Sequence, residues 1–81
     1  MRKNKYKLQI GDVLYEASRG RKKVIKWEIV NIFVEDYMSG SKVIFVVENE
    51  VYGKCEKFLS DVSHWLDTEG EATKCLEKMF A

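Results

Sequence analysis

The sequence has few of the side chains from which catalytic and metal sites are usually built. Its 81 residues include one histidine, His64, and two cysteines, Cys55 and Cys75, which stand twenty positions apart. Zinc sites use closely spaced pairs of Cys or His, and the sequence has no such pair. We therefore expect no metal and no cofactor. Both thiols are expected to be small buried side chains, with a disulfide or a reactive thiol as the alternatives.

Long apolar runs are also missing. No stretch approaches the ~20 residues that a membrane-spanning helix needs. Residues 1–7 are basic and are followed by an alternating segment, not by the apolar centre of a signal peptide. We therefore expect a cytoplasmic protein that does not contact a membrane.

The motifs of common enzyme classes are absent as well. The sequence has no phosphate-binding loop, no dinucleotide fingerprint and no nucleophile elbow. His64 lies close to serine and aspartate in the segment 60–64, but side chains of one short turn rarely converge as a Ser-His-Asp site requires. The carboxylates at 35–36 and 48–50 lack a third polar partner at a recognisable spacing. We therefore predict that the protein is not an enzyme.

What the chain does contain is typical of a small globular domain. Hydrophobic residues make up 46% of it and charged residues 33%, a balance unlike that of disordered chains. A chain of this length forms one domain, 1–81, which buries roughly 60% of its unfolded surface, so every apolar cluster must join the core. We expect a monomer or a small homo-oligomer.

Charge is divided along the sequence, although the formal net charge is only +1. Residues 1–26 carry nine Lys and Arg against two carboxylates, whereas residues 27–81 carry five Lys against eleven carboxylates. The first part therefore has a balance of +7 and the second a balance of −6. This division predicts a surface with regions of opposite sign.

The hydrophobic pattern predicts four strands, at about 6–17, 24–38, 42–50 and 54–59. Gly11-Asp12 marks a bend or bulge in the first strand. The second strand is long enough to bend and to be shared between two sheets. Turns are expected at Ser39-Gly40-Ser41 and at Gly53, because glycine adopts a positive φ without strain.

The end of the chain carries a helix signal. Thr68 and Glu71 match a capping box, in which the threonine oxygen accepts from the Glu71 amide and the Glu71 side chain reaches the threonine amide. A helix over about 69–80 would place these apolar residues on one face: Ala72, Cys75, Leu76, Met79 and Phe80. Because a helix this short is not stable by itself in water, its apolar face must pack on the sheet. A short helical turn is expected at 61–64.

These elements together predict a mainly β (α+β) fold. We expect a small, strongly bent antiparallel β-barrel of four or five strands with one short C-terminal α-helix. A flat sheet with the helix packed across it is the competing architecture.

Two segments resemble known proteins. Ile10–Tyr15, IGDVLY, resembles the opening strand of Src-homology-type small barrels. Trp65–Ala72, WLDTEGEA, is similar to the closing segment of short, mostly uncharacterised proteins encoded by phages and mobile elements of Gram-positive bacteria, with Asp67 as an extra residue. The resemblance implies a barrel and a phage-like origin, and it carries over no catalytic residues.

A candidate basic patch consists of Lys5, Lys7, Arg19, Arg21, Lys22, Lys23 and Lys26. If the first hairpin gathers these residues, they form a positive surface for nucleic acid, with Tyr6, Tyr15 or Trp27 as stacking surfaces. Trp27, however, shares the core-facing parity of Ile25 and Ile29. Two alternatives remain for this patch. It could contact an acidic protein surface, or it could be a solvated loop whose lysines keep a sheet edge from pairing with another strand.

A candidate acidic patch for a protein partner consists of Glu35, Asp36, Glu48 and Glu50. Carboxylates on a small scaffold can occupy the cationic groove of a nucleic-acid-binding enzyme and compete with its substrate. Charge and resemblance together give the leading hypothesis, a phage-encoded protein that inhibits a host defence protein, such as a CRISPR effector nuclease, by direct contact. The alternatives are a nucleic-acid-binding module that uses the 19–26 hairpin loop and an accessory or assembly subunit.

Overall fold

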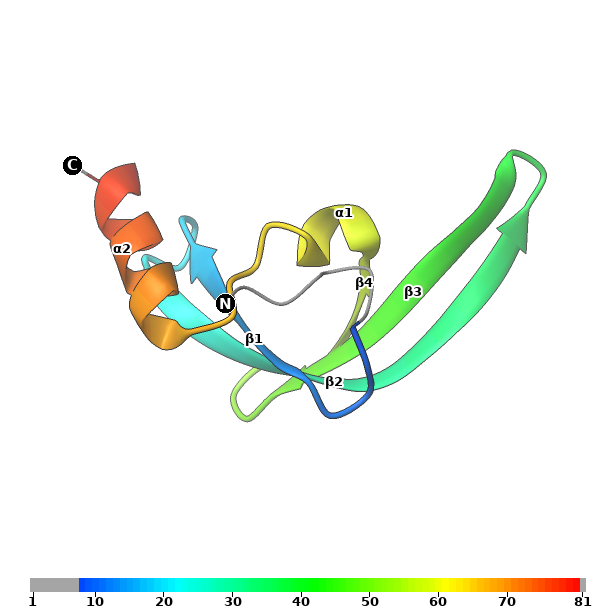
Figure 1. Cartoon of the computed structure of the whole chain (residues 1–81), viewed down its shortest axis with the longest axis horizontal. Helices are drawn as coiled ribbons and strands as arrows, with labels where there is room; N and C mark the ends of the chain where they lie inside the picture. The colour runs from blue at the N-terminus through cyan, green and yellow to red at the C-terminus, as the bar shows by residue number, and fades with distance from the viewer. Residues whose placement is uncertain (1–7, 81) are drawn as a thin grey trace.

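The computed structural model describes residues 8–80 and contains one antiparallel sheet (Figure 1). Its strands lie side by side in chain order: β1 (Val13–Ser18), β2 (Lys23–Tyr37), β3 (Gly40–Asn49) and β4 (Gly53–Phe58). Two helices follow, α1 (Leu59–Val62) and α2 (Glu69–Met79). The expectation of a mainly β fold with antiparallel strands and a short C-terminal helix is confirmed.

The sheet is curved but not closed, so the predicted barrel is wrong. β1 and β4 stand at opposite ends of the strand order β1-β2-β3-β4. Instead of continuing as a strand, the chain turns at Gln9–Asp12, where Gly11 has φ +97° and the Asp12 amide donates to the Gln9 carbonyl at 3.1 Å. The two six-residue edge strands are too short to close four strands into a barrel. The two helices cover the concave face of the sheet instead (Figure 1).

β2 bends at a bulge and stays in this one sheet. Its register with β3 shifts between Ile29 and Asn31, and such an extra residue bends a strand and increases its twist. The sharing of β2 between two sheets, expected from its length, does not occur because the bulge provides the bend locally. Residues 31–43, here called the arm, are the hairpin that follows the bulge.

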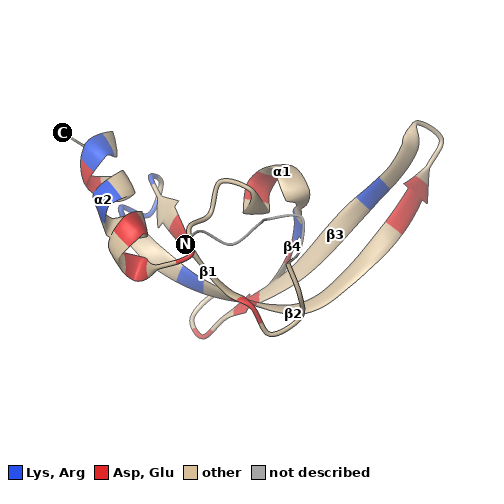
Figure 2. Ribbon diagram, in the orientation of Figure 1, with Lys and Arg blue, Asp and Glu red and all other residues tan. Residues whose placement is uncertain are grey.

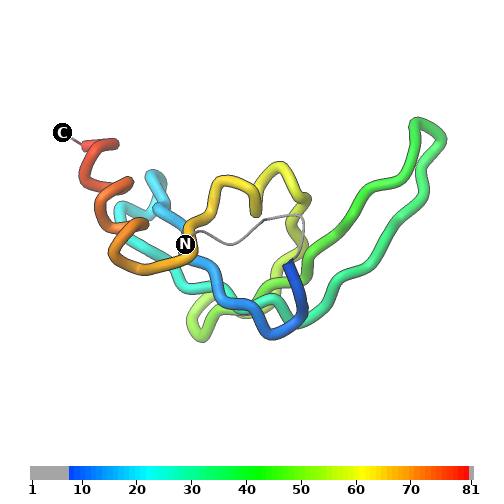
Figure 3. Tube along the Cα trace, viewed as in Figure 1, coloured from blue at the N-terminus to red at the C-terminus, as the bar shows by residue number. Residues whose placement is uncertain are grey.

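The arm projects beyond the rest of the sheet (Figure 3). β1 pairs with β2 only from Lys23 to Glu28, and β4 pairs with β3 only from Ile44 to Asn49. The Cα radius of gyration is 13.2 Å, whereas a compact domain of this length has about 11–12 Å. The arm is therefore a two-stranded ribbon with little support from the strands beside it.

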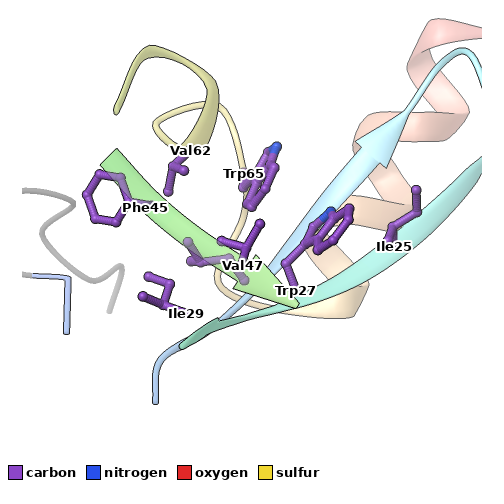
Figure 4. Close-up of a cluster of buried hydrophobic side chains, with 8 residues drawn as sticks. Ile25, Trp27, Ile29, Phe45, Val47, Val62 and Trp65 are labelled. Carbon is purple, nitrogen blue, oxygen red and sulfur yellow. The ribbon is translucent and has the colours of Figure 1, made fainter. Parts of the chain in front are cut away.

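The core lies on the concave face, where alternate residues of β2 and β3 meet Val62 of α1 and Trp65 (Figure 4). The cluster contains Leu14, Ile25, Trp27, Ile29, Phe45, Val47, Val62 and Trp65. The Trp27 and Trp65 rings stack with centroids 5.7 Å apart. The Trp27 indole N–H donates to Glu16 Oε1 at 2.9 Å, so this buried donor has a partner.

Glycine occupies the position of positive φ in both later hairpins. Tyr37 pairs with Gly40, which has φ +127°, so the first of them turns at Met38-Ser39, one residue earlier than expected. Asn49 pairs with Gly53, which has φ +73°, as the sequence predicts. The Asn49 side-chain oxygen accepts from the Val51 and Tyr52 amides at 2.7 and 3.0 Å, which stabilises this turn.

α2 begins at the predicted cap and docks on β1 and β2. Thr68 Oγ1 accepts from the Glu71 amide at 3.2 Å, while the Glu71 carboxylate accepts from the Thr68 hydroxyl rather than from the threonine amide. Ala72 is fully buried, Cys75 and Leu76 are half-buried, and Phe80 is 51% exposed. Docking therefore involves the first part of the predicted apolar face and weakens toward the C-terminal end of the helix. No helix within residues 8–80 is long and apolar enough to span a membrane.

Leu76→Asp should lower the free energy of unfolding by about 1–3 kcal/mol, because it places a charge against the sheet. Lys74→Asp is the matched control, since residue 74 is exposed on the same helix, and it should cost less than about 0.5 kcal/mol. Urea denaturation followed by circular dichroism measures both. Equal stability of the two variants would show that Leu76 does not hold the helix on the sheet.

Candidate functional site

Four residues of the predicted basic patch lie at one turn. Arg19, Arg21 and Lys22 form the exposed loop between β1 and β2, and Lys23 is the first residue of β2. These four residues are here called the basic turn, which lies near α2 in Figure 2. Lys26 is also exposed, but it alternates with Ile25 and Trp27 and so projects from the opposite face of the sheet. Lys5 and Lys7 lie outside the described residues.

The basic turn rests on Tyr52, from the turn between β3 and β4. Arg21 Cζ lies 4.2 Å and Lys23 Nζ 5.3 Å from the centroid of the Tyr52 ring. A hydrogen bond with Lys23 and the positive charges of Lys23 and Arg21 lower the pKa of Tyr52, although partial desolvation opposes this effect. Two cations that stand 29 and 31 residues before Tyr52 in the sequence are thus held on one ring. Cation–π contacts of this kind attract the side chains without neutralising their charge.

Tyr52 was missed by sequence reasoning, which named Tyr6, Tyr15 and Trp27 as stacking surfaces. Trp27 is only 3% exposed and belongs to the core, as its parity indicates. Its ring lies 6.4 Å from that of Tyr52, so Tyr52 connects the core to the basic turn. Tyr15 is half-buried, and its backbone pairs with Leu66. The only sequence signal for Tyr52 is an aromatic residue next to the glycine of a turn.

The backbone of the basic turn is strained at Lys22. Its φ is +57°, the one positive φ outside glycine within residues 8–80. A residue with a Cβ atom pays about 1–2 kcal/mol for the left-handed conformation. The turn is otherwise supported, since Ser18, which is 6% exposed, accepts from the Arg21 amide at 3.3 Å. A lysine at a position that favours glycine stores strain of the kind that is found at functional sites.

Lys22→Gly should raise the free energy of unfolding by about 1 kcal/mol, because glycine adopts this φ without a Cβ clash. Lys22→Ala is the matched control, since it removes the charge but keeps the strain. Thermal and urea denaturation separate the two variants. A glycine variant no more stable than the alanine variant would mean that the turn is not strained.

The predicted acidic patch is split into two pairs. Glu35 and Asp36 lie in the arm, whereas Glu48 lies near the end of β3 and Glu50 in the turn that follows. Glu35 pairs with Lys42, which is six residues from Glu48 along β3, a distance of about 20 Å. The Tyr37 hydroxyl donates to Glu35 at 2.9 Å, and this bond raises the pKa of Tyr37. The four carboxylates therefore do not form one surface.

Glu48 instead faces another carboxylate. Glu28 and Glu48 are directly opposite in the β2/β3 register, and both line a depression together with Lys26 and Glu50. On its other side, Glu48 pairs with Lys54 of β4. Like charges directly opposite each other in a sheet repel. Lys26 and Lys54 lie beside these carboxylates and offset the repulsion.

His64 lies in a groove on the concave side, between α1 and α2. The groove is lined by residues that include Glu16, Lys57, Asp61, His64, Cys75 and Met79. Asp61 accepts from the Phe58 amide at 3.2 Å, and Ser63 donates to the Ser60 carbonyl at 3.1 Å. These side chains thus cap the α1 turn. Cys75 and Cys55 are free and half-buried, and residues 8–80 contain no cluster of three His, Cys, Asp or Glu placed to hold a metal ion.

The fold and its surfaces define a small domain of one curved antiparallel sheet, a C-terminal helix and a projecting hairpin. Comparison of the chain with protein-family models, with curated proteins and with solved structures finds no match. Inferences about function therefore rest on the geometry described above.

Proposed function

We propose that this protein is a non-enzymatic binding protein whose basic turn binds the phosphates of nucleic acid. The observation that carries the proposal is the arrangement of four cations on one turn, two of them held on the Tyr52 ring. The ring restrains the long side chains of Arg21 and Lys23 before binding, which lowers the conformational entropy that binding costs. Restrained cations that remain charged release counterions when they meet phosphates.

Binding through this turn is expected to depend on the backbone rather than on base sequence. Arg21 already lies on the Tyr52 ring, and Trp27 is in the core, so neither aromatic side chain is free to stack on bases. The contacts that remain are those of Lys and Arg with phosphates, which carry no sequence information. We therefore expect similar affinities for oligonucleotides of different sequence.

Fluorescence anisotropy with labelled single-stranded and duplex oligonucleotides tests this function. The logarithm of the association constant should fall linearly with the logarithm of the salt concentration, with a slope of about −3 for four contacts to a single strand. Oligonucleotides of equal length and different sequence should bind alike. Titrations that stay flat at low salt would refute nucleic-acid binding.

Inhibition of a host defence protein, such as a CRISPR effector nuclease, is the second candidate function. It is favoured by the arm, which projects from the sheet and carries Glu35 and Asp36 near its tip (Figure 2). A narrow projection with carboxylates has the shape and charge to enter a cationic groove that otherwise holds nucleic acid. An origin in a phage or mobile element belongs to this second candidate.

Inhibition of a defence nuclease should depend on the carboxylates of the arm and not on the basic turn. In a cleavage assay with a guide-loaded CRISPR nuclease, Glu35→Lys/Asp36→Lys should weaken inhibition. Glu48→Lys/Glu50→Lys is the matched control, since it reverses two carboxylates outside the arm, and it should inhibit like the unmodified protein. Inhibition that survives both reversals would exclude this electrostatic account.

A further inference from the structure

The outer edge of β2 in the arm has no partner strand within residues 8–80. On that side, the last backbone hydrogen bonds join Ile29 to Gly11 and Asp12, at 2.7 and 2.8 Å. Among the described residues, the edge therefore has no partner from the bulge to Tyr37. Unpaired edges of this kind are templates for another strand, and proteins usually protect them.

The backbone groups that point outward can be assigned from the hairpin. Antiparallel pairs alternate between those that exchange hydrogen bonds and those that do not. Counting from the two-residue turn between Tyr37 and Gly40, the N–H and C=O groups that point away from β3 belong to Ile32, Val34 and Asp36. The Ile32 amide agrees with this assignment, since it donates to the Asn31 side chain at 2.9 Å instead of to β3.

The other edges of the sheet carry lysine, which this one lacks, although this edge has a bulge at its start and two carboxylates. β4 has Lys54 and Lys57, and the arm segment of β3 has Lys42. The middle of β1 is covered, since Tyr15 exchanges two backbone hydrogen bonds with Leu66, both 2.8 Å. By contrast, the free edge of β2 contains no lysine, arginine or proline from Asn31 to Tyr37. Lysine on an edge is a common device against strand addition, so its absence sets this edge apart.

Apolar side chains continue from the core onto the arm. Phe45 and Ile32 pair across the concave face, and Val34 and Val43 follow them outward. Phe45 is 5% exposed, but Val34 is 62% exposed, so the apolar stripe extends past the helices that cover it. At its outer end the edge carries Glu35 and Asp36 and no cation.

We propose that the free edge of β2 binds an extended segment of another protein as an added antiparallel strand. The segment hydrogen-bonds to the N–H and C=O groups of Val34 and Asp36 and to the Ile32 carbonyl, because the Asn31 side chain already accepts from the Ile32 amide. It carries apolar side chains where it passes Val34. A lysine or arginine where it passes Glu35 and Asp36 adds attraction between opposite charges on neighbouring strands, on the side away from Lys42, which stands opposite Glu35. A second copy of this chain is a poorer occupant, since its own edge would bring two more carboxylates and no cation.

The proposal deepens the protein-binding role of the arm and does not depend on the basic turn. The probe is an acetylated and amidated eight-residue peptide, with two lysines followed by alternating valine and threonine. Antiparallel addition places its N-terminal lysines beside the arm tip. The control peptide has the same sequence with alternate backbone amides N-methylated, which removes the donors that an added strand needs.

Calorimetric titration and amide hydrogen exchange give the readouts. The probe should bind, the N-methylated peptide should not, and exchange at Val34 and Asp36 should slow by about tenfold or more. Val34→Lys should weaken binding by about tenfold, because lysine at an edge opposes strand addition. Val51→Lys is the matched control, at a valine 77% exposed outside the arm, and it should bind like the unmodified protein.

Three results would overturn the proposal: no binding of the probe, equal binding of the N-methylated peptide, or unchanged binding by Val34→Lys. Sedimentation that shows self-association abolished by Val34→Lys would assign the edge to a second copy instead. Because the probe contains neither nucleic acid nor nuclease, failure here leaves both functions of the preceding section to their own tests.

Discussion

Replacing Trp27 with alanine is expected to lower the free energy of unfolding by about 3–5 kcal/mol, as for other large aromatic side chains in cores. Trp27 is 3% exposed, stacks on Trp65 at 5.7 Å and donates to Glu16. A domain of this length has a total stability of about 4–12 kcal/mol. The substitution should therefore remove between about a quarter and all of the stability of the fold, and urea and thermal denaturation will measure this loss.

Trp27→Phe is the control for the ring itself. Phenylalanine keeps an aromatic ring against Trp65 but lacks the indole donor, so it should cost clearly less than alanine. A Trp27→Ala protein that melts at the temperature of the unmodified protein would show that the cluster around Trp27 does not hold the fold together.

Removing three cations from the basic turn is expected to have the largest effect on binding. Arg21→Ala/Lys22→Ala/Lys23→Ala should weaken the association with single-stranded oligonucleotides by about 100-fold at low salt, and should reduce the magnitude of the salt slope by about 2, because three phosphate contacts are lost. These side chains are exposed, so the fold should persist. Anisotropy titrations at several salt concentrations measure both quantities.

The matched control removes the same charge elsewhere. Lys42→Ala/Lys54→Ala/Lys74→Ala changes three exposed lysines outside the turn and should leave the affinity within a fewfold of the unmodified protein. If both triple variants lose affinity equally, net charge rather than the basic turn drives the binding.

Local signals in the sequence predicted much of the secondary structure. Thr68 and Glu71 indicated where α2 begins, and a hydrogen bond between them forms the cap. Gly53 indicated a hairpin, and it has the positive φ that the turn needs. Parity placed Trp27 in the core with Ile25 and Ile29. These features are predictable because each depends on residues within a few positions of one another.

Closure of the sheet was not predictable in the same way. The resemblance and the alternating pattern favoured a barrel, but the pattern is the same for an open and a closed sheet. The turn at Gln9–Asp12 shortens β1, and α1 and α2 cover the concave face. Whether a sheet closes depends on strand length, twist and what covers it, and these involve the whole chain.

For the candidate sites too, some features follow from local sequence and others depend on the tertiary structure. The sequence by itself determined that Arg19, Arg21, Lys22 and Lys23 share one turn and that Thr68 starts a helix, because neighbours in the chain are neighbours in space. Only the tertiary structure placed Tyr52 under Arg21 and Lys23 and separated Glu35 and Asp36 from Glu48. It also left the outer edge of β2 in the arm without a partner strand within residues 8–80. Those outcomes depend on strand register and on where β1 and β4 end, which local sequence does not encode.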